Sequence, residues 1–598
     1  MRRKLIPFIL SFLLLHLAGH AQTAMINVYG RNTVSLNGKW EIIVDPFDVG
    51  IGWRAIYKDA KATGKNDFIE YSFDPANTLN VPGDFNSQLP ELTYFESSVW
   101  YKRSFDCPID KNQRYFIHFG AASCIADVYF NGKKLGRHEG GFTPFQFEVS
   151  NLIKEKDNSL IVRVNSARVK NGIPGLLFDW FNYGGITRDV HLIKTRKIFI
   201  DDYKIQLDPQ DNGRIAGYVQ LDTALSGQKI ALTIPELKVK EQVTTDAKGY
   251  AVISLKKKIQ LWTPDEPKLY NVDLSVDGDS VNDRIGFRSI KVIGTKILLN
   301  GKPIFLRGVN IHEEIPQKKA RASSDADAHW LIDRAKELGC NFVRLVHYPH
   351  SEYEVKYAAE KGLLVWEEIP VYQGIEFTDP AVKGKAKLML KELIKRDKNR
   401  CSVIFWSIAN ETRPSRERDE TLVELAKEVK TLDPTRLVTA AFDDVARKGN
   451  EMQLKDTVMK YVDVIGVNEY MGWYVDWPTQ PEQMKWVSDF NKPMIISEFG
   501  GESVYNNKTD TAVKASAWSE EYVANIYRNQ IKMFGSIPFL QGVCPWVLAD
   551  FRSPYRMQST YQKGWNRKGL LSDHGEKKKA WYIMQAYYEQ LKKRGQPQ

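Results

Sequence analysis

The pattern of hydrophobic and polar residues changes near residue 293. Before that point, apolar and polar residues alternate over short runs such as SLNGKWEIIV and NSLIVRV, separated by turn signals such as NG and DN. Alternation with a period of two is typical of strands that bury one face. The pattern predicts two β-sandwiches, a jelly-roll-like one at 22–195 and a smaller one at 196–292. The second, with about 100 residues, has the size of an immunoglobulin-like domain.

From 293 to 598, short apolar strands alternate with amphipathic stretches such as DADAHWLIDRAKELG, which predict helices. The predicted strands lie at 303–310, 341–349, 363–368, 402–411, 437–444, 463–470, 493–500 and 542–548. Eight strand–helix units in about 300 residues predict a (β/α)8 TIM barrel. Because chemistry in that fold gathers at the C-terminal ends of the strands, their polar ends are the first place to search.

The first 21 residues follow neither pattern. A basic start, MRRK, precedes an apolar run at 5–17, and Gly19 and Ala21 occupy the −3 and −1 positions of a cleavage site. This predicts a signal peptide at 1–21, and no lipoprotein cysteine follows it. No later apolar stretch is long enough for a membrane span. The sequence therefore predicts a periplasmic or secreted protein.

Composition narrows the function classes only slightly. The net charge is +11, of which the predicted signal peptide carries +3. The basic residues are scattered, which is typical of solvated faces rather than of a nucleic-acid surface, although such a field attracts acidic substrates. The cysteines are odd in number and widely spaced, with no CxxC pair and no grouping with histidine that suits a metal. We therefore expect free thiols and no metal site; the cysteines are Cys107, Cys124, Cys340, Cys401 and Cys544.

Two glutamates end predicted barrel strands. Strand four ends in WSIANE with Glu411, and strand seven ends in ISEFG with Glu498. A lone glutamate at a strand end more often forms a salt bridge, but two on opposite sides of a barrel mouth favour catalysis. Cleaving a glycosidic bond with retention needs two carboxyls about 5 Å apart. One has a raised pKa and protonates the leaving oxygen, while the other stays ionised and attacks the anomeric carbon.

Several stretches resemble glycoside hydrolase family 2. DKNRCSVIFWSIANE (397–411) is similar to the family's acid/base signature, and NFVRLVHYPHSEYEVKYAAEKGLLVWEE (341–368) to its other signature. LWTPDEPKLYNVDLSV, DRIGFRSI and LNGKPIFLRGVNIHE resemble the junction between its immunoglobulin-like domain and its barrel. The resemblance covers essentially the whole chain after residue 21. It implies hydrolysis without a cofactor, with Glu411 as acid/base, Glu498 as nucleophile and Asn410 as the partner of the sugar 2-hydroxyl.

Residues beside the catalytic positions depart from the family pattern. Larger residues replace the small ones usual before His347, and the pair 400–401 reads Arg-Cys where His-Pro is common. His347 and Arg344 are expected to order the carboxylate network, with Arg344 holding the nucleophile ionised. His312, in NIHEE, is expected in the pocket, where it orients the sugar or a glutamate.

Three further stretches resemble the β-glucuronidases of the family. FDWFNYGGITR (178–188) is similar to their sandwich loop that reaches into the barrel mouth. NEYMGWYV (468–475) is similar to the end of their sixth strand. WVLADF and GWNRKGL are similar to the end of their eighth strand and the loop that follows it. The substrate-binding residues so implied are Asp179, Tyr470, Tyr474, Asn566 and Lys568. Trp546 ends a barrel strand, where a tryptophan is either core or stacks under the sugar, and it is expected to bind substrate. The resemblance implies that Asn566 and Lys568 bind a uronic acid carboxylate, with Lys568 supplying charge and Asn566 a neutral hydrogen bond.

The favoured interpretation is a retaining exo-β-glucuronidase, and two alternatives remain. One is a β-galactosidase or β-galacturonidase of the same family, because enzymes acting on neutral sugars can carry a similar Asn-x-Lys-Gly-Leu run. Some β-glucuronidases also have an arginine shortly before the Asn-x-Lys, where this chain has Gln562; Arg552 or Arg556 would then serve instead. The other is a carbohydrate-binding protein on a degenerate barrel, which the two intact glutamates disfavour.

The predicted partner is a carbohydrate with a terminal uronic acid, and whether the chain forms a homo-oligomer stays open. The loop VYQGIEFTDPAVKGK after strand three is short. A short loop predicts an open mouth, which would admit a terminal glucuronic acid on an oligosaccharide as well as a small glucuronide.

Overall fold

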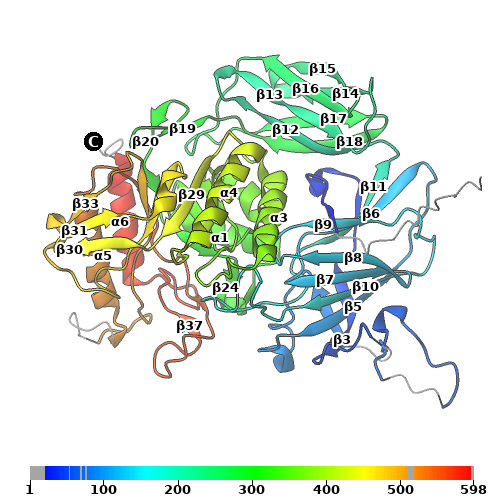
Figure 1. Ribbon diagram of the computed structural model, residues 1–598, viewed down its shortest axis with the longest axis horizontal. Helices are drawn as coiled ribbons and strands as arrows, with labels where there is room; N and C mark the ends of the chain where they lie inside the picture. The colour runs from blue at the N-terminus through cyan, green and yellow to red at the C-terminus, as the bar shows by residue number, and fades with distance from the viewer. Residues whose placement is uncertain (1–20, 53, 67–69, 74–76, 510–516, 594–598) are drawn as a thin grey trace, which may run out of the picture.

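The computed structural model describes residues 21–52, 54–66, 70–73, 77–509 and 517–593. Figure 1 shows three units: a β-sandwich formed early in the chain, a second β-sandwich, and a barrel with helices around it. The fold class predicted from the sequence is confirmed. The predicted signal peptide lies outside the described residues except for Ala21.

The first sandwich packs two antiparallel sheets face to face. One has the strand order β1-β9-β6-β11-β2 and the other β4-β3-β5-β10-β7-β8. The strands are β1 (Gln22–Thr23), β2 (Thr33–Ser35), β3 (Gly38–Asp45), β4 (Asn77–Val81), β5 (Ser98–Phe105), β6 (Gln113–Phe119), β7 (Ile125–Phe130), β8 (Lys133–Glu139), β9 (Phe145–Glu148), β10 (Asn158–Asn165) and β11 (Val190–Arg196). Alternate residues of β5 face different cores: Tyr101 packs between the sheets, whereas Trp100 packs on the outer face with Tyr129. The strand is therefore apolar on both faces, as SVWY suggests.

The second sandwich is smaller and has a single core. Its sheets have the orders β12-β13-β16 and β15-β14-β17-β18. The strands are β12 (Ile200–Asp208), β13 (Asp211–Leu221), β14 (Lys229–Ile234), β15 (Val239–Thr244), β16 (Tyr250–Lys256), β17 (Tyr270–Val276) and β18 (Asp279–Ile285). In β18 buried and exposed residues alternate without a break, which is the period-two pattern of a strand with one wet face. A small sheet of β19 (Ile290–Ile293), β20 (Lys296–Leu299) and β21 (Lys302–Pro303) leads into the barrel.

The barrel closes through its first strand, which is split in two. β22 (Leu306–Arg307) pairs with β35 (Leu540–Val543), and β23 (Asn310–His312) pairs with β26 (Phe342–Val346). At the break, a Cβ on Gly308 would lie 2.2 Å from Cys544 Sγ, so only glycine fits. Between these ends run β27 (Leu364–Glu368), β28 (Val403–Asn410), β29 (Leu437–Phe442), β32 (Val464–Asn468) and β34 (Met494–Glu498), all parallel. All eight predicted strands are present.

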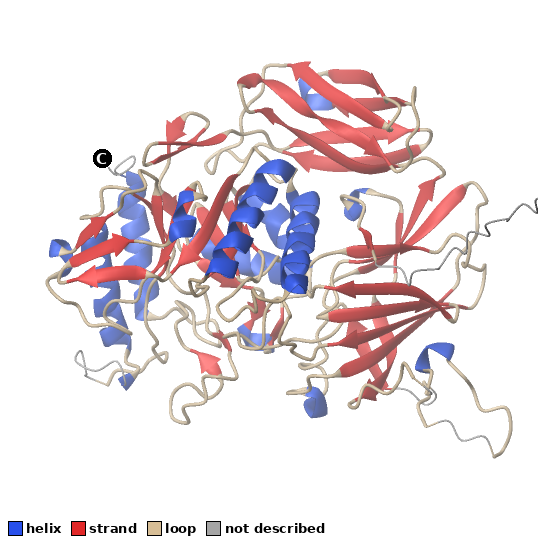
Figure 2. Ribbon diagram, viewed as in Figure 1, coloured by secondary structure: helices blue, strands red, loops and turns tan. Residues whose placement is uncertain are grey.

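Helices cover the outside of the barrel, but not between every pair of strands (Figure 2). The α-helices of the described chain are α1 (Asp325–Glu337), α2 (Glu352–Lys361), α3 (Pro380–Asp397), α4 (Arg416–Leu432), α5 (Glu520–Phe534) and α6 (Lys579–Lys593). Between β29 and β34 the expected helices are wrong: this stretch forms short 3-10 turns and a small sheet of β30 (Val445–Lys448), β31 (Glu451–Leu454) and β33 (Lys485–Val487). The stretch 477–493 is rich in proline and polar residues and has no long amphipathic period.

Two short hairpins complete the C-terminal mouth of the barrel. β24 (Glu314–Ile315) pairs with β25 (Ala320–Arg321) after strand one. β36 (Phe551–Arg552) pairs with β37 (Trp565–Asn566) after strand eight, so Asn566 is fixed by a backbone ladder.

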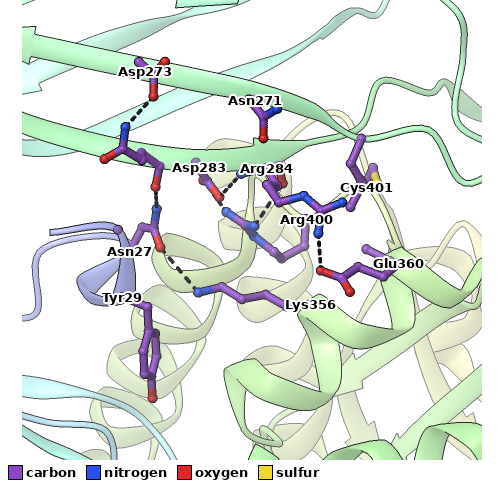
Figure 3. A pocket seen from close by; sticks show the side chains of 14 residues that line it. Asn27, Tyr29, Asn271, Asp273, Asp283, Arg284, Lys356, Glu360, Arg400 and Cys401 are labelled. Carbon is purple, nitrogen blue, oxygen red and sulfur yellow. Dashed lines mark hydrogen bonds and ion pairs between the residues drawn. The ribbon is translucent and has the colours of Figure 1, made fainter.

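A cavity of about 450 Å³ lies where the N-terminal segment, the second sandwich and α2 meet (Figure 3). Lys356 donates to Asn27 Oδ1 (3.3 Å), and Arg284 pairs with Glu360 (2.6 Å). Arg400, which precedes β28, pairs with Asp283. These pairs join the second sandwich to the N-terminal end of the barrel strands, away from the mouth, and their charges compensate one another.

Candidate active site

Glu411 and Glu498 line one cavity of about 440 Å³ at the C-terminal mouth of the barrel. Glu498 is the last residue of β34, and Glu411 directly follows β28. A register irregularity between Ser407 and Asn410, followed by a left-handed backbone at Glu411 (φ 50°), ends the ladder there. Glu411 N–H still donates to Ala441 O (2.9 Å), which ties the turn to β29. Glu498 is 4% exposed and Glu411 is half-buried.

Both oxygens of Glu498 accept hydrogen bonds. Arg344 Nη1 donates to Oε1 (2.8 Å) and Tyr470 OH to Oε2 (2.8 Å). Arg344 is completely buried and also donates from Nε and Nη2 to Glu368 at 3.0–3.1 Å. Glu368 in turn accepts from Trp366 Nε1 (2.8 Å). This rigid network fixes the orientation of the Glu498 carboxyl, which is what a nucleophile needs.

The two glutamates interact electrostatically. Burial, and next the charge of Glu411, raise the pKa of Glu498 to about 8, although Arg344 and Tyr470 stabilise its ionised form. At neutral pH the Glu498 carboxyl therefore tends to keep its proton, and this proton must leave before the carboxylate attacks. The sequence led us to expect that Arg344 keeps Glu498 ionised. Arg344 does lower the pKa of Glu498, but burial and the charge of Glu411 outweigh it.

Neutral amides surround Glu411. Asn468 Nδ2 donates to Oε1 (2.7 Å), and Gln373 Nε2 donates to Oε2 (2.9 Å). Neither was singled out from the sequence, although Asn468 ends β32 and obeys the same strand-end rule. Gln373 lies in the short loop after β27.

Asn410 has a donor with no partner. Arg344 Nη2 donates to its Oδ1 (2.7 Å), and because a guanidinium cannot accept, this contact fixes the orientation of the amide. Asn410 Nδ2 is buried and makes no hydrogen bond within the described chain. A buried orphan amide beside two catalytic carboxyls is ready to donate to a ligand hydroxyl.

At the side of the cavity formed by the strand-eight loop, two cations alternate with two anions. Lys568 Nζ lies 3.2 Å from Glu502 Oε1 and 5.2 Å from the centre of the Tyr474 ring. Arg556 bridges Glu502 (3.4 Å) and Asp179. Asn566 Nδ2 also donates to Asp179 (3.2 Å). Among the residues of this cluster, Glu502 was missed from the sequence; it follows Glu498 by four residues in SEFGGE.

Glu502 is the centre of this charge cluster. It is 1% exposed, and although burial alone would raise its pKa, Lys568 and then Arg556 lower it to about 2. Gln562, at the position where some β-glucuronidases have arginine, donates to Glu502 (2.9 Å). Of the two arginines considered instead, Arg556 lines the cavity, whereas Arg552 stacks 3.6 Å above the Phe181 ring.

Aromatic rings form the base of the cavity. Trp546 lines it and stacks on His347 with ring centres 4.9 Å apart, and His347 Nδ1 is fixed by Glu368 (2.9 Å). His312, expected in the pocket, packs edge-on against Trp546 at 5.4 Å and lies 4.1 Å from the Phe551 ring. Trp546 lines the cavity, whereas His312 does not.

The sandwich loop 178–188 reaches the barrel, and its Trp180 packs against His347 and Tyr372 at 5.5 and 5.0 Å. Tyr372 also lines the cavity and was not singled out from the sequence. Its ring partners, Trp180 of the sandwich and His347 of the barrel (4.7 Å), are distant in the sequence, so no local signal marks it.

The described residues contain no group of three His, Cys, Asp or Glu that could hold a metal ion. All five cysteines are unpaired. No helix in the described ranges has the length and apolarity to cross a membrane.

Models of the three family 2 domains match almost the whole described chain. The TIM barrel domain of glycosyl hydrolases family 2 matches residues 290–593, the sugar binding domain of that family matches 33–196, and a third model of glycosyl hydrolases family 2 matches 198–288. The chain belongs to glycosyl hydrolases family 2.

Similar proteins point in the same direction. A putative β-glucuronidase of Formosa agariphila is 27% identical over 90% of this chain and 70% of its own length. A β-glucuronidase of Paenibacillus borealis is 26% identical over 86% of this chain and 93% of its own. The solved β-glucuronidase of an uncultured Clostridium species has a TM-score of 0.81 and 25% identity, covering 95% of this chain and all of its own.

Proposed function

We propose that the protein is a retaining exo-β-glucuronidase that hydrolyses terminal β-linked glucuronic acid from glycans or conjugates. One observation carries the choice of sugar: a buried ammonium, Lys568, lies in the cavity beside Asn566, across the barrel from Glu411. The similarity to proteins named β-glucuronidase supports the same choice.

A uronate suits this charge cluster. Lys568 has three N–H donors, and Glu502 takes one of them at 3.2 Å, which leaves donors for a ligand carboxylate. The positive charges of Lys568 and Arg556 are compensated by the negative charges of Glu502 and Asp179, so the lysine stays charged. Without a cation nearby, burying a carboxylate would cost several kcal/mol. A neutral sugar could accept a hydrogen bond from the ammonium but would gain no charge–charge attraction.

The proposed reaction has two displacements at the anomeric carbon. Glu498 attacks the anomeric carbon with its carboxylate, whose Oε1 is held by Arg344 and whose Oε2 is held by Tyr470. The bond to the leaving oxygen breaks as Glu411 protonates that oxygen, and a covalent glycosyl-enzyme forms. Glu411 then removes a proton from the water that attacks the same carbon, which releases Glu498. Asn410 Nδ2 donates to the sugar 2-hydroxyl, a contact that strengthens at the transition state.

Substrate comparison tests this proposal. We expect hydrolysis of 4-nitrophenyl β-D-glucuronide and little of the β-D-galactoside. The β-D-galacturonide is the second candidate, because Gln562 stands in place of an arginine and Arg556 approaches the cluster from another direction. If the galactoside alone is hydrolysed, the proposal is refuted. If Glu498→Gln hydrolyses the glucuronide unchanged, the chain is not a glycosidase of this mechanism.

We also propose that the loop after β27 leaves room for oligosaccharides. It runs from 369 to 379 before α3 begins, and Gln373 reaches Glu411 without covering the cavity with an insertion. Comparable kcat/KM for a glucuronyl oligosaccharide and for an aryl glucuronide would support this proposal. A strong preference for small aryl glucuronides would contradict it.

The localisation is proposed to be periplasmic or secreted. Cleavage after Ala21 would leave Gln22 as the first residue, and Gln22 begins β1, whose pairing with Gln146 needs no earlier residue. N-terminal sequencing of protein recovered outside the cytoplasm should begin at Gln22. A start at Met1 would contradict the proposal.

A further inference from the structure

Three strongly basic side chains line the active-site cavity, and they differ in their partners. Arg556 and Lys568 are compensated by Asp179 and Glu502. Arg447, also in the lining, makes no side-chain hydrogen bond or ion pair within the described residues. An unpaired guanidinium at the wall of a substrate cavity is available to an anionic ligand.

Arg447 belongs to the side of the cavity that carries the acid/base residue. It lies in β30, which follows β29, and Glu411 is hydrogen-bonded to Ala441 of β29. Asn566 and Lys568 come from the loop after the eighth strand, on the other side of the barrel. A sugar with its carboxylate at Lys568 and its glycosidic oxygen at Glu411 therefore directs its leaving group toward β30.

No carboxyl of the described residues forms an ion pair with this arginine. Asp443 and Glu469 line the same cavity. The charge of Arg447 lowers the pKa of Glu469, but burial outweighs it and raises that pKa to about 7, so Glu469 is a weak counter-charge. Glu469 accepts from the backbone of Met471 (3.1 Å) and from Gln530, and the amide of Gln373 is held by Glu411. The guanidinium of Arg447 therefore has its hydrogen-bond donors available to a ligand.

We propose that Arg447 belongs to the leaving-group subsite and selects leaving groups that carry an acidic substituent, a carboxylate or a sulfate. This rests on the proposed function, since it presupposes a glucuronide with its carboxylate at Lys568. The preferred substrate is then an acidic glycan, in which the residue released next to the terminal glucuronic acid is itself charged.

The test compares leaving groups that have one shape and differ in charge. The pairs are 4-carboxyphenyl against 4-carbamoylphenyl β-D-glucuronide, and 4-sulfophenyl against 4-sulfamoylphenyl β-D-glucuronide. For each pair, the ratio of kcat/KM for the charged member to that for the neutral member is measured in wild type, Arg447→Gln and Arg447→Lys. Lys448→Gln is the matched control, because it removes a charge from the neighbouring exposed residue, which does not line the cavity.

We expect Arg447→Gln to lower the charged-to-neutral ratio about fivefold, as for a partly exposed charge-assisted contact. Arg447→Lys should restore part of it, and Lys448→Gln should leave it unchanged. The carboxylate and sulfonate pairs show which anion is preferred. Equal ratios in wild type and Arg447→Gln for both pairs would overturn the inference while leaving the glucuronidase proposal intact. Failure of the wild type to hydrolyse any glucuronide would overturn the proposed function itself, and this inference with it.

Discussion

Replacing Lys568 by methionine is the sharpest test of how the sugar is chosen. Methionine keeps an unbranched stem of similar length and removes only the charge and the N–H donors. Lys568 is 2% exposed, so no solvent molecule replaces the lost donor without cost. We expect a loss of kcat/KM on 4-nitrophenyl β-D-glucuronide and little change on the β-D-galactoside.

The size of the effect follows from the contacts of the ammonium. Removing one partner of a buried, hydrogen-bonded charge pair costs about 2–5 kcal/mol. Arg556 stays within the same cluster and retains part of the positive potential. We therefore expect a loss of transition-state stabilisation of about 3 kcal/mol, which is about 150-fold in kcat/KM. Glu502 keeps Gln562 (2.9 Å) and Arg556 (3.4 Å), so the loop should retain its structure. On the galactoside, which has no carboxylate, a change below about threefold is expected.

Initial rates on both substrates measure this, with Lys563→Met as the matched control. Lys563 is exposed, lies in the same loop and does not line the cavity, so it undergoes the same change of charge without the contact. Equal losses on glucuronide and galactoside for Lys568→Met would show that the lysine supports the loop and does not recognise a carboxylate. That result would refute the reasoning.

The remaining predictions concern the catalytic pair and its support. Glu498→Gln should lower kcat by on the order of 10³ or more, measured with the glucuronide; smaller losses would indicate another nucleophile. Burial and the charge of Glu411 raise the pKa of Glu498 to about 8, so this nucleophile ionises only as the pH approaches that value, and kcat/KM should rise by up to about tenfold per pH unit below it; a rate that does not rise with pH would contradict this. Asn410→Ala should lose about 2 kcal/mol of transition-state stabilisation on the glucuronide and much less on its 2-deoxy analogue, and equal losses would exclude the 2-hydroxyl contact. Glu502→Gln should lower the free energy of unfolding by about 2 kcal/mol in urea titrations, against less than about 0.5 kcal/mol for the partly exposed Glu521→Gln; similar values would show that Glu502 anchors nothing.

The strands of the barrel could be predicted because each is a short apolar run that ends in polar residues. Glu411, Glu498 and Asn410 are found at such ends, where the backbone alone fixes the direction of the side chain. The helices between β29 and β34 could not be predicted correctly, since regular alternation was assumed where the chain forms a hairpin and 3-10 turns. The proline and polar residues of 477–493 disfavour a long helix, but this feature was recognised only after the fold was known.

Side chains that depend on tertiary neighbours were the ones that sequence reasoning missed or misplaced. Glu502 lies past a strand end, and its partner Lys568 is 66 residues further along the chain. His312 does end a barrel strand, as expected of a site residue, but it packs against Trp546 and does not line the cavity. Arg447 belongs to a hairpin that was expected to be a helix, so its position in the wall of the cavity had no signal in the sequence.

The nucleophile and the proposed carboxylate site are physically linked by five residues of chain. Glu498 ends β34, and the same segment continues through Gly500, whose backbone (φ 139°) only glycine adopts readily, to Glu502. Glu502 accepts from Lys568 and Gln562, so the strand that fixes the attacking oxygen also fixes the cation across the sugar ring. A shift of this segment would move both groups together and keep their spacing. The choice of sugar and the placement of the anomeric carbon therefore depend on one short piece of backbone. This gives the buried carboxylate of Glu502 a role in a pocket that is proposed to bind the carboxylate of the sugar.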